Sequence, residues 1–572
     1  MDNNLDKIRH SASHVLAMAV IELFPEVKLA IGPSIDDGFY YDFELPRNLT
    51  EDDLPKIEAI MEKIKKQNIP FVESKMEIHE GHKFFSDKGQ DYKVELIEDL
   101  IKDENEEISI YSSGDFIDLC KGPHVSNTGE IGYFKLTKIA GAYWKGSEKN
   151  KMLTRIYGTT WTTAKELEEY SQRIEQAVQN DHRKLGKELG LFVFSDLVGS
   201  GLPLYTPKGA LLRSTIQNYS KSLRNRINYE EVYTPQINKA DLFKTSGHYE
   251  KYKKNMFSVK SNYSDDEFFL KPMNCPQHIQ IYASQIRSYK DLPIRYSDYA
   301  NLYRDEKPGE LSGLTRLRAF SQDDAHCFCR EDQIKDEFNR ILSAIKDAMT
   351  KFDLEYSIRL SLRDEKKQDE YLGDQKIWHE SQELLEQILV ENEIKFVRAE
   401  GEAAFYGPKM DLIIKDSLGR EWQLSTIQLD LNMPSRFEIK YTDQDGIEKT
   451  PIMIHSAILG SPERFMGILI EHYKGSFPVW LAPVQIKIIT VSNDLLDDAQ
   501  KIKETLTQKN IRVELDQSNE TVGKKIRNAE MEKIPYIITY GKREQQSSEL
   551  SVRINNEVKV YTIEKLIEEI LK

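Results

Sequence analysis

The chain has 572 residues and a formal net charge of −15, from 79 Lys and Arg against 94 Asp and Glu. No run of eighteen apolar residues occurs, which excludes a membrane span, and 39% hydrophobic residues with 28 Tyr and 23 Phe argue against disorder. The N-terminus lacks the cationic start and apolar stretch of a signal peptide, and four cysteines cannot staple a fold of this size. We therefore expect a cytoplasmic, multidomain globular protein that holds any nucleic acid by local patches.

Two short motifs near the N-terminus each pair a possible ligand with a histidine four positions later. His10 and His14 lie in a stretch with helical spacing, and Cys120 and His124 lie in the segment DLCKGPH. A spacing of four on a helix places both side chains on one face. The four groups could bind Zn²⁺ or form an acid/base pocket without metal. The alternative for an isolated pair is a solvated helix face.

Changes of pattern along the chain predict four parts. A stretch of helix-forming residues from about 162, ending at Gly190, indicates one exposed helix that joins two domains. After it, predicted antiparallel strands alternate with long helices, as in an α+β domain, and the tail alternates strands and helices as in a small α/β domain with a partly parallel sheet. The predicted boundaries are 1–161, 162–186 for the linker, 187–480 and 481–572.

Three widely separated residues of the third part could share a metal ion. Cys275 lies in KPMNCP, His326 in QDDAH and His455 in IMIHSAILGS. Their separation excludes a compact zinc finger but suits a catalytic site in which three ligands leave a fourth position open. The alternative is a buried thiol and two core imidazoles. Cys327 and Cys329 alternate around a phenylalanine, and we expect both to pack in a core.

Arginines in the same part indicate a phosphate clamp. Arg304 and Glu306 precede a polar loop, Arg316 and Phe320 follow it on a returning strand, and Arg464 opens a helix. Guanidinium groups pair bidentately with phosphate oxygens, while Glu and Phe could hold an adenine edge and ring. The alternative is salt bridging on a solvated sheet. Because neither GxxxxGK[ST] nor a GxGxxG after a strand occurs, any ATP is held without a P-loop or Rossmann cradle.

Taken together, these motifs resemble the bacterial threonyl-tRNA synthetases, which are class II aminoacyl-tRNA synthetases, over essentially the full chain. HxxxH and CxxxH resemble the editing domain, the Arg304–Glu306 loop resembles motif 2, and GSPE-Arg464 resembles motif 3. YT-Pro235 after a long helix resembles the motif 1 dimer segment. The resemblance implies a multidomain α+β and α/β fold: an N-terminal α+β editing domain, a class II antiparallel-sheet catalytic domain and a C-terminal α/β anticodon-binding domain.

For the catalytic domain, the resemblance implies one catalytic Zn²⁺ per subunit on Cys275, His326 and His455, with open positions for the amino and hydroxyl groups of L-threonine. ATP with Mg²⁺ reacts with threonine to give threonyl-adenylate, and threonine then passes to tRNA(Thr). The implied catalytic residues are Arg304, Arg464, Gln322, Asp324, Tyr406 and Lys409. The implied ATP-binding residues are Arg304, Glu306, Arg316, Phe320, Gln423, Gln428 and Arg464.

The resemblance also implies two sites that handle the tRNA. Serine differs from threonine by one methyl group, which is worth only about 1–3 kcal/mol in binding, so a second, hydrolytic site for seryl-tRNA(Thr) is expected. The implied editing residues are His10, His14, Lys93, Asp118, Cys120 and His124, to which we assign no metal. The implied anticodon contacts are Asn519, Arg527, Glu544 and Arg553.

Some features depart from the family pattern. Most members begin with a ubiquitin-like domain, which we expect to be absent here because His10 lies so close to Met1. Gln277 replaces a Gly and Ser456 replaces the usual Arg, so the pocket rim is expected to differ. The open alternatives are a synthetase for serine or proline, a non-catalytic RNA-binding paralogue, and an N-terminal half released by cleavage as a free deacylase. The motif 1 resemblance alone predicts a homodimer.

Overall fold

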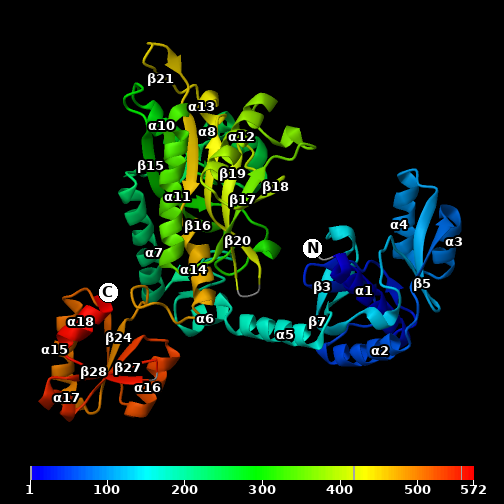
Figure 1. The fold of residues 1–572 in the computed structure, drawn as a ribbon, viewed down its shortest axis with the longest axis horizontal. Helices are drawn as coiled ribbons and strands as arrows, with labels where there is room; N and C mark the ends of the chain where they lie inside the picture. The colour runs from blue at the N-terminus through cyan, green and yellow to red at the C-terminus, as the bar shows by residue number, and fades with distance from the viewer. Residues whose placement is uncertain (1–2, 417–418, 556, 572) are drawn as a thin grey trace. The chain divides into compact units, whose positions relative to one another are not determined.

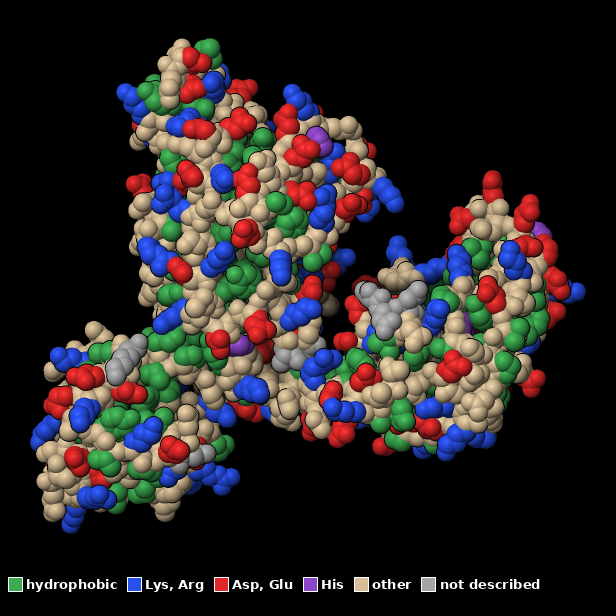
Figure 2. All heavy atoms as spheres, in the orientation of Figure 1, with side chains coloured by type: hydrophobic (Ala, Val, Ile, Leu, Met, Phe, Trp, Pro, Cys, Tyr) green, Lys and Arg blue, Asp and Glu red, His purple; other side chains and the backbone are tan. Residues whose placement is uncertain are grey.

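The computed structural model describes residues 3–416, 419–555 and 557–571. The chain divides into two compact units, with the boundary between Glu175 and Gln176 (Figure 1). Among the described residues, no helix is both long and apolar enough to cross a membrane. Figure 2 shows Lys and Arg side chains interspersed with Asp and Glu side chains over the visible face.

The first unit is built around an antiparallel sheet with strand order β1-β3-β8-β7, in which β2 also pairs with β3. Two helices, α1 and α2, pack their apolar faces on this sheet around Val15, Leu16, Phe43 and Ile57. The elements are α1 (Asn3–Leu23), β1 (Lys28–Leu29), β2 (Ser34–Ile35), β3 (Gly38–Glu44), α2 (Leu54–Lys66), β7 (Tyr133–Tyr143) and β8 (Met152–Trp161). His10 and His14 lie on α1, so the predicted helix is confirmed.

A second sheet of the first unit has the order β4-β5-β6, and α3 and α4 pack on it around Phe85, Ile97 and Ile108. The elements are β4 (Val72–Glu77), α3 (Ile78–Asp87), α4 (Asp91–Lys102), β5 (Glu107–Ser113) and β6 (Phe116–Leu119). The start of α4 is tied to β1, because the side-chain oxygen of Gln90 accepts a hydrogen bond from the Leu29 N–H at 2.7 Å. Just after β6, Cys120 lies 3.3 Å from His10 of α1, so the CxxxH segment meets the HxxxH segment.

The expectation of one continuous helix from 162 to 190 is wrong. The structure has two helices, α5 (Ala164–Gln179) and α6 (His182–Glu188). Asp181 ends the first helical run because its side chain accepts a hydrogen bond from the Arg183 N–H at 2.7 Å and so caps a new helix. The segment is thus a helix, a break and a capped second helix.

The second unit contains a large sheet with the order β11-β15-β16-β23-β20-β19-β17-β18. Its central pairs are antiparallel, and only the edge pairs β11–β15 and β17–β18 are parallel. The strands are β11 (Glu230–Glu231), β15 (Ile294–Tyr303), β16 (Ala319–Cys329), β17 (Tyr356–Leu362), β18 (Phe396–Glu400), β19 (Lys409–Lys415), β20 (Glu421–Asp430) and β23 (Ile452–Ala457). The predicted antiparallel catalytic sheet is confirmed.

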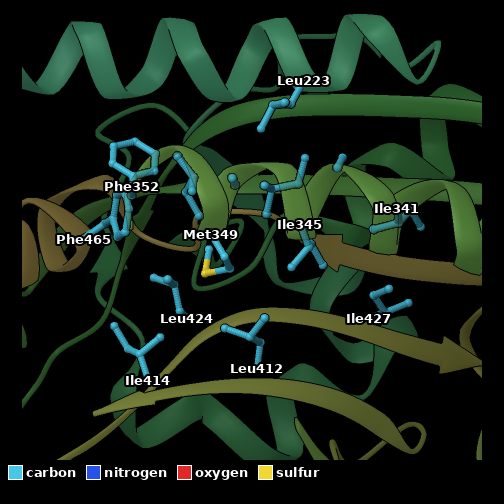
Figure 3. Packing of buried hydrophobic residues seen from close by; sticks show 14 of the residues in the cluster. Leu223, Ile341, Ile345, Met349, Phe352, Leu412, Ile414, Leu424, Ile427 and Phe465 are labelled. Atoms are coloured by element: carbon cyan, nitrogen blue, oxygen red, sulfur yellow. The ribbon is translucent and has the colours of Figure 1, made fainter. Parts of the chain in front are cut away.

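One face of this sheet is covered by α11 (Ile334–Lys351), with α7 (Pro207–Arg226) and α14 (Pro462–His472) beside it. In Figure 3 the side chains of Ile345 and Met349 on α11 point toward Leu412 and Leu424 of the sheet. Cys327 and Cys329 are fully buried in the same core, as expected. The apolar face of the sheet thus faces α11 and leaves the opposite face for polar side chains.

Smaller elements surround this sheet. They are β9 (Phe192–Val193), β10 (Leu204–Tyr205), β12 (Ile237–Lys239), α8 (Ala240–Ser246), α9 (His248–Tyr252), β13 (Ser258–Val259), β14 (Phe268–Leu270), α10 (Cys275–Ala283), α12 (Gln375–Glu391), α13 (Met433–Arg436), β21 (Tyr441–Thr442) and β22 (Glu448–Lys449). The strands form the sheets β10–β9, β12-β14-β13 and β21–β22. Cys275 is therefore the first residue of α10.

The C-terminal part of the second unit is a sheet with the order β25-β24-β26-β27-β28. The first three strands are parallel and the last pairs are antiparallel, as the alternating pattern predicts. The elements are β24 (Ile486–Thr490), α15 (Leu496–Thr507), β25 (Val513–Asp516), α16 (Val522–Met531), β26 (Tyr536–Tyr540), α17 (Lys542–Ser547), β27 (Leu550–Ile554), β28 (Glu557–Tyr561) and α18 (Ile563–Leu571). The predicted α/β fold of the tail is confirmed.

A buried ion pair joins α7 to the two strands that carry the predicted histidine ligands. The Nε of Arg224 donates to Asp323 of β16 at 3.0 Å, and its terminal nitrogens donate to the hydroxyl and carbonyl of Ser456 on β23 at 2.8 and 2.9 Å. The second carboxylate oxygen of Asp323 accepts from the backbone N–H groups of Ile458 and Leu459. One guanidinium therefore fixes β16 and β23 relative to the helix.

Replacement of Arg224 by Leu is expected to lower the free energy of unfolding of the second unit by about 3–5 kcal/mol, because the Asp323 carboxylate would stay buried without its cation. Urea denaturation followed by near-UV circular dichroism measures the change. The control is Arg226→Leu, since Arg226 pairs with Asp347 at an exposed position of the same helix. Equal effects of the two substitutions would contradict the role assigned to the buried pair.

Candidate functional site

The register of the large sheet places four predicted site residues in one row. His326 of β16 lies opposite His455 of β23, His455 lies opposite Gln428 of β20, and Gln428 lies opposite Lys409 of β19. Residues that face one another across antiparallel strands project to the same side of the sheet. Gln322 and Asp324 precede His326 at two-residue steps and share its face. The side chains therefore converge on the face opposite α11.

Cys275 completes a buried cluster with His326 and His455. Their ligand atoms lie within 4.8 Å of one another, although Cys275 comes from α10 and the histidines come from the sheet. His326 Nε2 lies 3.1 Å from His455 Nδ1, and the three side chains are between 1% and 5% exposed. One thiol and two imidazoles form a donor set that suits Zn²⁺.

Residues around the cluster fix the orientation of the two imidazoles. His455 Nε2 lies 2.9 Å from an oxygen of Asp430, and because an ionised carboxylate only accepts, this nitrogen carries the proton. His455 Nδ1 is then left as a lone pair aimed toward His326. His278 of α10 contacts Nδ1 of His326 at 2.7 Å. Such carboxylate and imidazole partners are typical of metal-binding histidines.

Burial controls the protonation of this cluster in the absence of an ion. Burial raises the pKa of the Cys275 thiol well above its usual value and lowers the pKa of His326 well below its usual value. The pKa of Asp324 rises to about 7, first because of burial and second because of the nearby Asp298 carboxylate. A bound dication would instead lower the pKa of the Cys275 thiol, because the cation favours the thiolate.

Beside this cluster lies a pocket of about 220 Å³ that contains most of the predicted nucleotide residues. It is lined by Arg304, Glu306, Leu314, Thr315, Arg316, Leu317, Phe320, Gln322, Gln423, Leu424, Thr426, Ala457, Leu459, Gly460, Ser461 and Arg464. Gln322 lines the pocket and lies on the same strand face as Asp324 and His326. The structure therefore places a cationic pocket next to the possible metal site.

Three guanidinium groups converge in this pocket. Burial, followed by the charges of Arg304 and Arg316, lowers the pKa of Arg464. Among the described residues, the buried Nε–H of Arg304 has no hydrogen-bond partner. The Nε of Arg464 donates to the carbonyl of Thr315 at 3.1 Å, which leaves its terminal nitrogens outside that bond. Mutually repelling cations with an unused donor favour an anionic ligand.

Two residues expected to hold adenine make other contacts in the structure. Glu306 accepts hydrogen bonds from Nε and a terminal nitrogen of Arg316 at 3.0 and 2.8 Å. The ring of Phe320 lies 5.2 Å from the guanidinium carbon of Arg304, a cation–π distance. The structure thus brings Glu306 and Phe320 to the pocket, with the carboxylate paired to an arginine.

Asp411 connects the remaining polar residues of the site and was missed in the sequence. It accepts hydrogen bonds from Lys409 at 2.7 Å, Gln423 at 2.8 Å and Thr426 at 3.0 Å. Its position two residues after Lys409 on a predicted strand is the signal that could have revealed it. Tyr406 donates to the Gln428 side chain at 2.6 Å and stacks on His455 with a centroid distance of 4.7 Å.

The first unit brings all six predicted editing residues together. Cys120 Sγ lies 3.3 Å from Nε2 of both His10 and His124, and the ligand atoms of these residues and His14 lie within 4.8 Å of one another. Buried Lys93 forms an ion pair with buried Asp118, and His14 Nε2 lies 3.6 Å from the same carboxylate. The residues come from α1, from α4, from β6 and from the loop that follows β6.

Burial favours the neutral forms of the thiol and of the three imidazoles in this pocket. It raises the pKa of Cys120 to about 11, and it lowers the pKa of His124 to about 2, with further lowering by His14 and His10. The pKa values of His10 and His14 are also lowered, first by burial. A neutral thiol is a poor nucleophile. The pocket therefore offers neutral imidazoles and one lysine–carboxylate pair for proton transfer and water placement.

Tyr41 of β3 supports this pocket and was not identified from the sequence. Its hydroxyl donates to Asp118 at 2.6 Å and accepts from the Lys93 ammonium at 3.1 Å. Ser11 contacts Nδ1 of His124 at 3.1 Å. Tyr41 lies in the alternating run GFYYDFE of a buried strand, where no pattern separates it from the core aromatic residues. Only the fold shows its polar role.

The predicted anticodon residues occupy different elements of the C-terminal sheet domain. Asn519 and Arg527 are exposed, the first before α16 and the second on it. Arg553 of β27 lies 3.7 Å from Glu530 of α16. The carboxylate of Glu544 accepts hydrogen bonds from the Gly541 N–H and the Ser551 hydroxyl, so it caps α17. The structure does not gather these four side chains into one cluster.

Three family models match the chain in the order of these sites. The threonyl and alanyl tRNA synthetase second additional domain matches residues 108–157, which contain Asp118, Cys120 and His124. The tRNA synthetase class II core domain for G, H, P, S and T matches residues 257–473, and the anticodon binding domain matches residues 485–572. The class II core match includes all three possible zinc ligands.

Curated relatives decide the family. Threonine–tRNA ligase of Gloeobacter violaceus is 48% identical over 96% of this chain and 88% of its own length, and that of a Geobacillus strain is 45% identical over 98% and 87%. The chain belongs to the threonine–tRNA ligases. It is therefore an enzyme that charges tRNA with threonine and edits mischarged tRNA. The alternatives of a serine or proline enzyme and of a non-catalytic paralogue are excluded.

Solved structures agree with this family. The RNA binding domain of threonyl-tRNA synthetase from Cryptosporidium parvum matches with a TM-score of 0.65 and 35% identity, covering 68% of this chain and 98% of that one. Threonyl-tRNA synthetase ThrRS-1 of Aeropyrum pernix matches with a TM-score of 0.60 and 29% identity, covering 68% and 95%. Prolyl-tRNA synthetase of Giardia lamblia, with a TM-score of 0.56 and 16% identity over 69% of this chain and 76% of that one, shares the fold.

Tyr41→Phe is expected to slow hydrolysis of mischarged tRNA by roughly ten- to hundredfold, because a buried hydrogen bond to a charged group is worth about 1.5–3 kcal/mol. Deacylation of preformed seryl-tRNA measures the effect, and threonine charging is expected to stay unchanged. Tyr40→Phe is the control, since Tyr40 precedes it on the same strand with its side chain on the other face. Equal deacylation by wild type and Tyr41→Phe would contradict the supporting role.

Proposed function

We propose that Cys275, His326 and His455 hold one catalytic Zn²⁺ that recognises L-threonine by its amino and hydroxyl groups. The observation that supports this is the buried sulfur–nitrogen–nitrogen donor set, with ligand atoms within 4.8 Å and a carboxylate behind His455. When bound, the ion supplies Lewis acidity and open coordination positions for substrate. Valine lacks the hydroxyl and would leave such a position unfilled, which an apolar pocket alone could hardly detect.

The arginine pocket is the proposed site of ATP, which binds with Mg²⁺. In this assignment Arg304 contacts the threonine carboxylate and the α-phosphate, and Arg316 and Arg464 contact the outer phosphates. Glu306 and Phe320 hold adenine, which requires Glu306 to leave Arg316 when the nucleotide enters. The threonine carboxylate attacks the α-phosphorus to form threonyl-adenylate and pyrophosphate. Positioning and charge neutralisation carry this step.

Polar residues of the row across the sheet complete the proposed substrate pocket. Asp324 and Gln322 contact the hydroxyl of threonine and neighbouring polar groups, and Tyr406 contacts its amino group. Lys409, Gln423 and Gln428 line the site, where Asp411 and Tyr406 hold their side chains by the hydrogen bonds described above.

Amino-acid-dependent exchange between ATP and pyrophosphate tests this assignment, with zinc content measured on the same protein. We expect strong exchange with threonine, weaker exchange with serine, none with valine or proline, and about one zinc per chain. Cys275→Ala is expected to lose both zinc and exchange, whereas Cys329→Ala, a core thiol on the other face of the sheet, is expected to keep both. A zinc-free Cys275→Ala variant with full exchange would refute the zinc assignment.

The editing pocket is proposed to hydrolyse seryl-tRNA(Thr) with His10, His14, Lys93, Asp118, Cys120 and His124. Neutral imidazoles can accept and pass protons, and the Lys93 ammonium, held by Asp118 and Tyr41, can orient water or the ester. A protonated Cys120 fits a hydrogen-bonding role better than a nucleophilic one. The reaction needs no metal in this assignment.

The double variant His10→Ala/His14→Ala is expected to charge threonine normally but to accumulate seryl-tRNA(Thr). Both imidazoles lie in the first unit, whereas the proposed activation residues lie in the second, so only hydrolysis loses its proton carriers. Parallel assays of threonine charging and seryl-tRNA deacylation measure the two activities. His82→Ala, at a half-buried position of α3 outside the pocket, is the control. Unchanged serine clearance in the double variant would remove the function assigned to this pocket.

The remaining proposals concern domains and partners. The proposed domains are 1–161, 162–186 as linker, 187–480 and 481–572, in a cytoplasmic enzyme. The last domain binds the anticodon of tRNA(Thr), with Asn519, Arg527, Glu544 and Arg553 as candidate contacts.

A homodimer is supported by exposed apolar side chains on the β9–β10 hairpin and on α7, which are Val193, Phe194, Leu197, Val198, Leu204 and Leu211.

A further inference from the structure

His182, the first residue of α6, lies buried between α14 and the loop that precedes β16. Its Nδ1 is 2.7 Å from a carboxylate oxygen of Glu471, and its Nε2 is 3.0 Å from the backbone nitrogen of Leu314, whose N–H donates. His182 and Glu471 are 3% and 8% exposed, and Leu314 is 1% exposed. Because Leu314 can only donate, Nε2 is an acceptor, and the proton lies on Nδ1 and points to Glu471.

The surroundings hold the ring in this orientation. The first oxygen of Glu471 also accepts from the His182 backbone N–H at 3.3 Å, and its second oxygen accepts from Arg420 at 3.3 Å. Gly313 has a φ of +46° and approaches the ring so closely that a Cβ there would lie 2.2 Å from Nε2. The backbone of the loop therefore rests directly on the imidazole.

The loop that His182 contacts carries the arginine pocket. Leu314 and Thr315 line this pocket, and the carbonyl of Thr315 accepts the Nε–H of Arg464 at 3.1 Å. One residue further, Arg316 points its guanidinium to Glu306 in the same pocket. A shift of the Leu314 backbone would therefore move the carbonyl that orients Arg464 and the base of Arg316.

A metal site at Asp181, His182 and Glu471 is the competing interpretation, since their ligand atoms lie within 4.8 Å of one another. Both ring nitrogens of His182 are already used, one by the Leu314 N–H and the other by the Glu471 carboxylate. The Asp181 carboxylate accepts from the backbone and side chain of Arg183. The lone pair that a metal would need is thus occupied by the loop.

We infer that His182 is a positioning residue for nucleotide binding: it holds the backbone at Leu314, and through it the carbonyl that orients Arg464 in the proposed ATP site. This inference rests on the proposed ATP site. The imidazole accepts the Leu314 N–H through Nε2, and the hydrogen bond from Nδ1 to Glu471 fixes the ring. His182 does not touch the substrates and acts only through the loop.

Two amide substitutions separate the two ring nitrogens. His182→Gln carries an amide oxygen near the position of Nε2 and can still accept from Leu314, whereas His182→Asn places its amide near Nδ1 and leaves the loop N–H unpaired. We expect His182→Asn to raise KM for ATP roughly three- to tenfold, as for one lost hydrogen bond, and His182→Gln to restore most of it. KM for threonine and deacylation of seryl-tRNA are expected to stay within about twofold. ATP–pyrophosphate exchange and deacylation assays give these values.

His472→Asn is the matched control, because this ring is exposed on the same helix as Glu471. Thermal melting of each variant separates positioning from loss of fold, since a purely structural role would raise both KM values together and not distinguish Gln from Asn. Equal ATP KM values for wild type and His182→Asn would overturn the inference. Arg464→Ala tests the ATP site itself: if it leaves KM for ATP unchanged, the proposed site fails, whereas a rise there without one in His182→Asn refutes only the role of His182.

Discussion

The pairing register of the central sheet is the constraint on which the catalytic chemistry depends. His326 faces His455, and His455 faces Gln428, because β16, β23 and β20 pair at one offset. A slip by one residue would turn these side chains into the core beneath α11 and bring Cys327 or Ile454 to the polar face. The Arg224–Asp323 pair opposes such a slip, since it bonds to both β16 and β23 from α7. The main role of this buried ion pair is thus to fix the pairing register, and its contribution to net stability is secondary.

The two neighbouring parts of the catalytic site use opposite electrostatics. Burial favours the neutral thiol of Cys275 and the neutral imidazole of His326, and together with His455 these groups form a donor set that suits a cation. In the neighbouring pocket, the guanidinium of Arg464, at the start of α14, lies near those of Arg304 and Arg316, and this excess of positive charge suits phosphate. Gln322 lies at the junction. The amino acid and the nucleotide can therefore meet where a cluster that suits a cation borders a pocket that suits an anion.

The antiparallel strands of the large sheet and the α/β pattern of the tail could be predicted from the sequence, because the pattern of side chains along a strand is a local property. The four-residue step between His10 and His14 indicated one helix face, and the family resemblance assigned these residues to editing. Residues that act through tertiary contacts carry weaker signals in the sequence. Tyr41 and His182 look like core and helix positions until the fold brings partners to them, and Asp411 is indicated only by its place two residues after Lys409. The break at Asp181 was also missed, because a cap depends on where the chain must turn to place α6 on α14.

Ser456, where the family resemblance predicts an arginine, lies against the buried guanidinium of Arg224. An arginine at this position would bring a second guanidinium beside that of Arg224, which is fully buried and already bonds to Asp323. With serine, the small hydroxyl accepts one of the Arg224 N–H groups, and the carbonyl of the same residue accepts another. One buried cation per carboxylate is what the interior tolerates, so Ser456 and Arg224 form a compatible pair. The charge behind the histidine ligands therefore comes from α7 and not from β23.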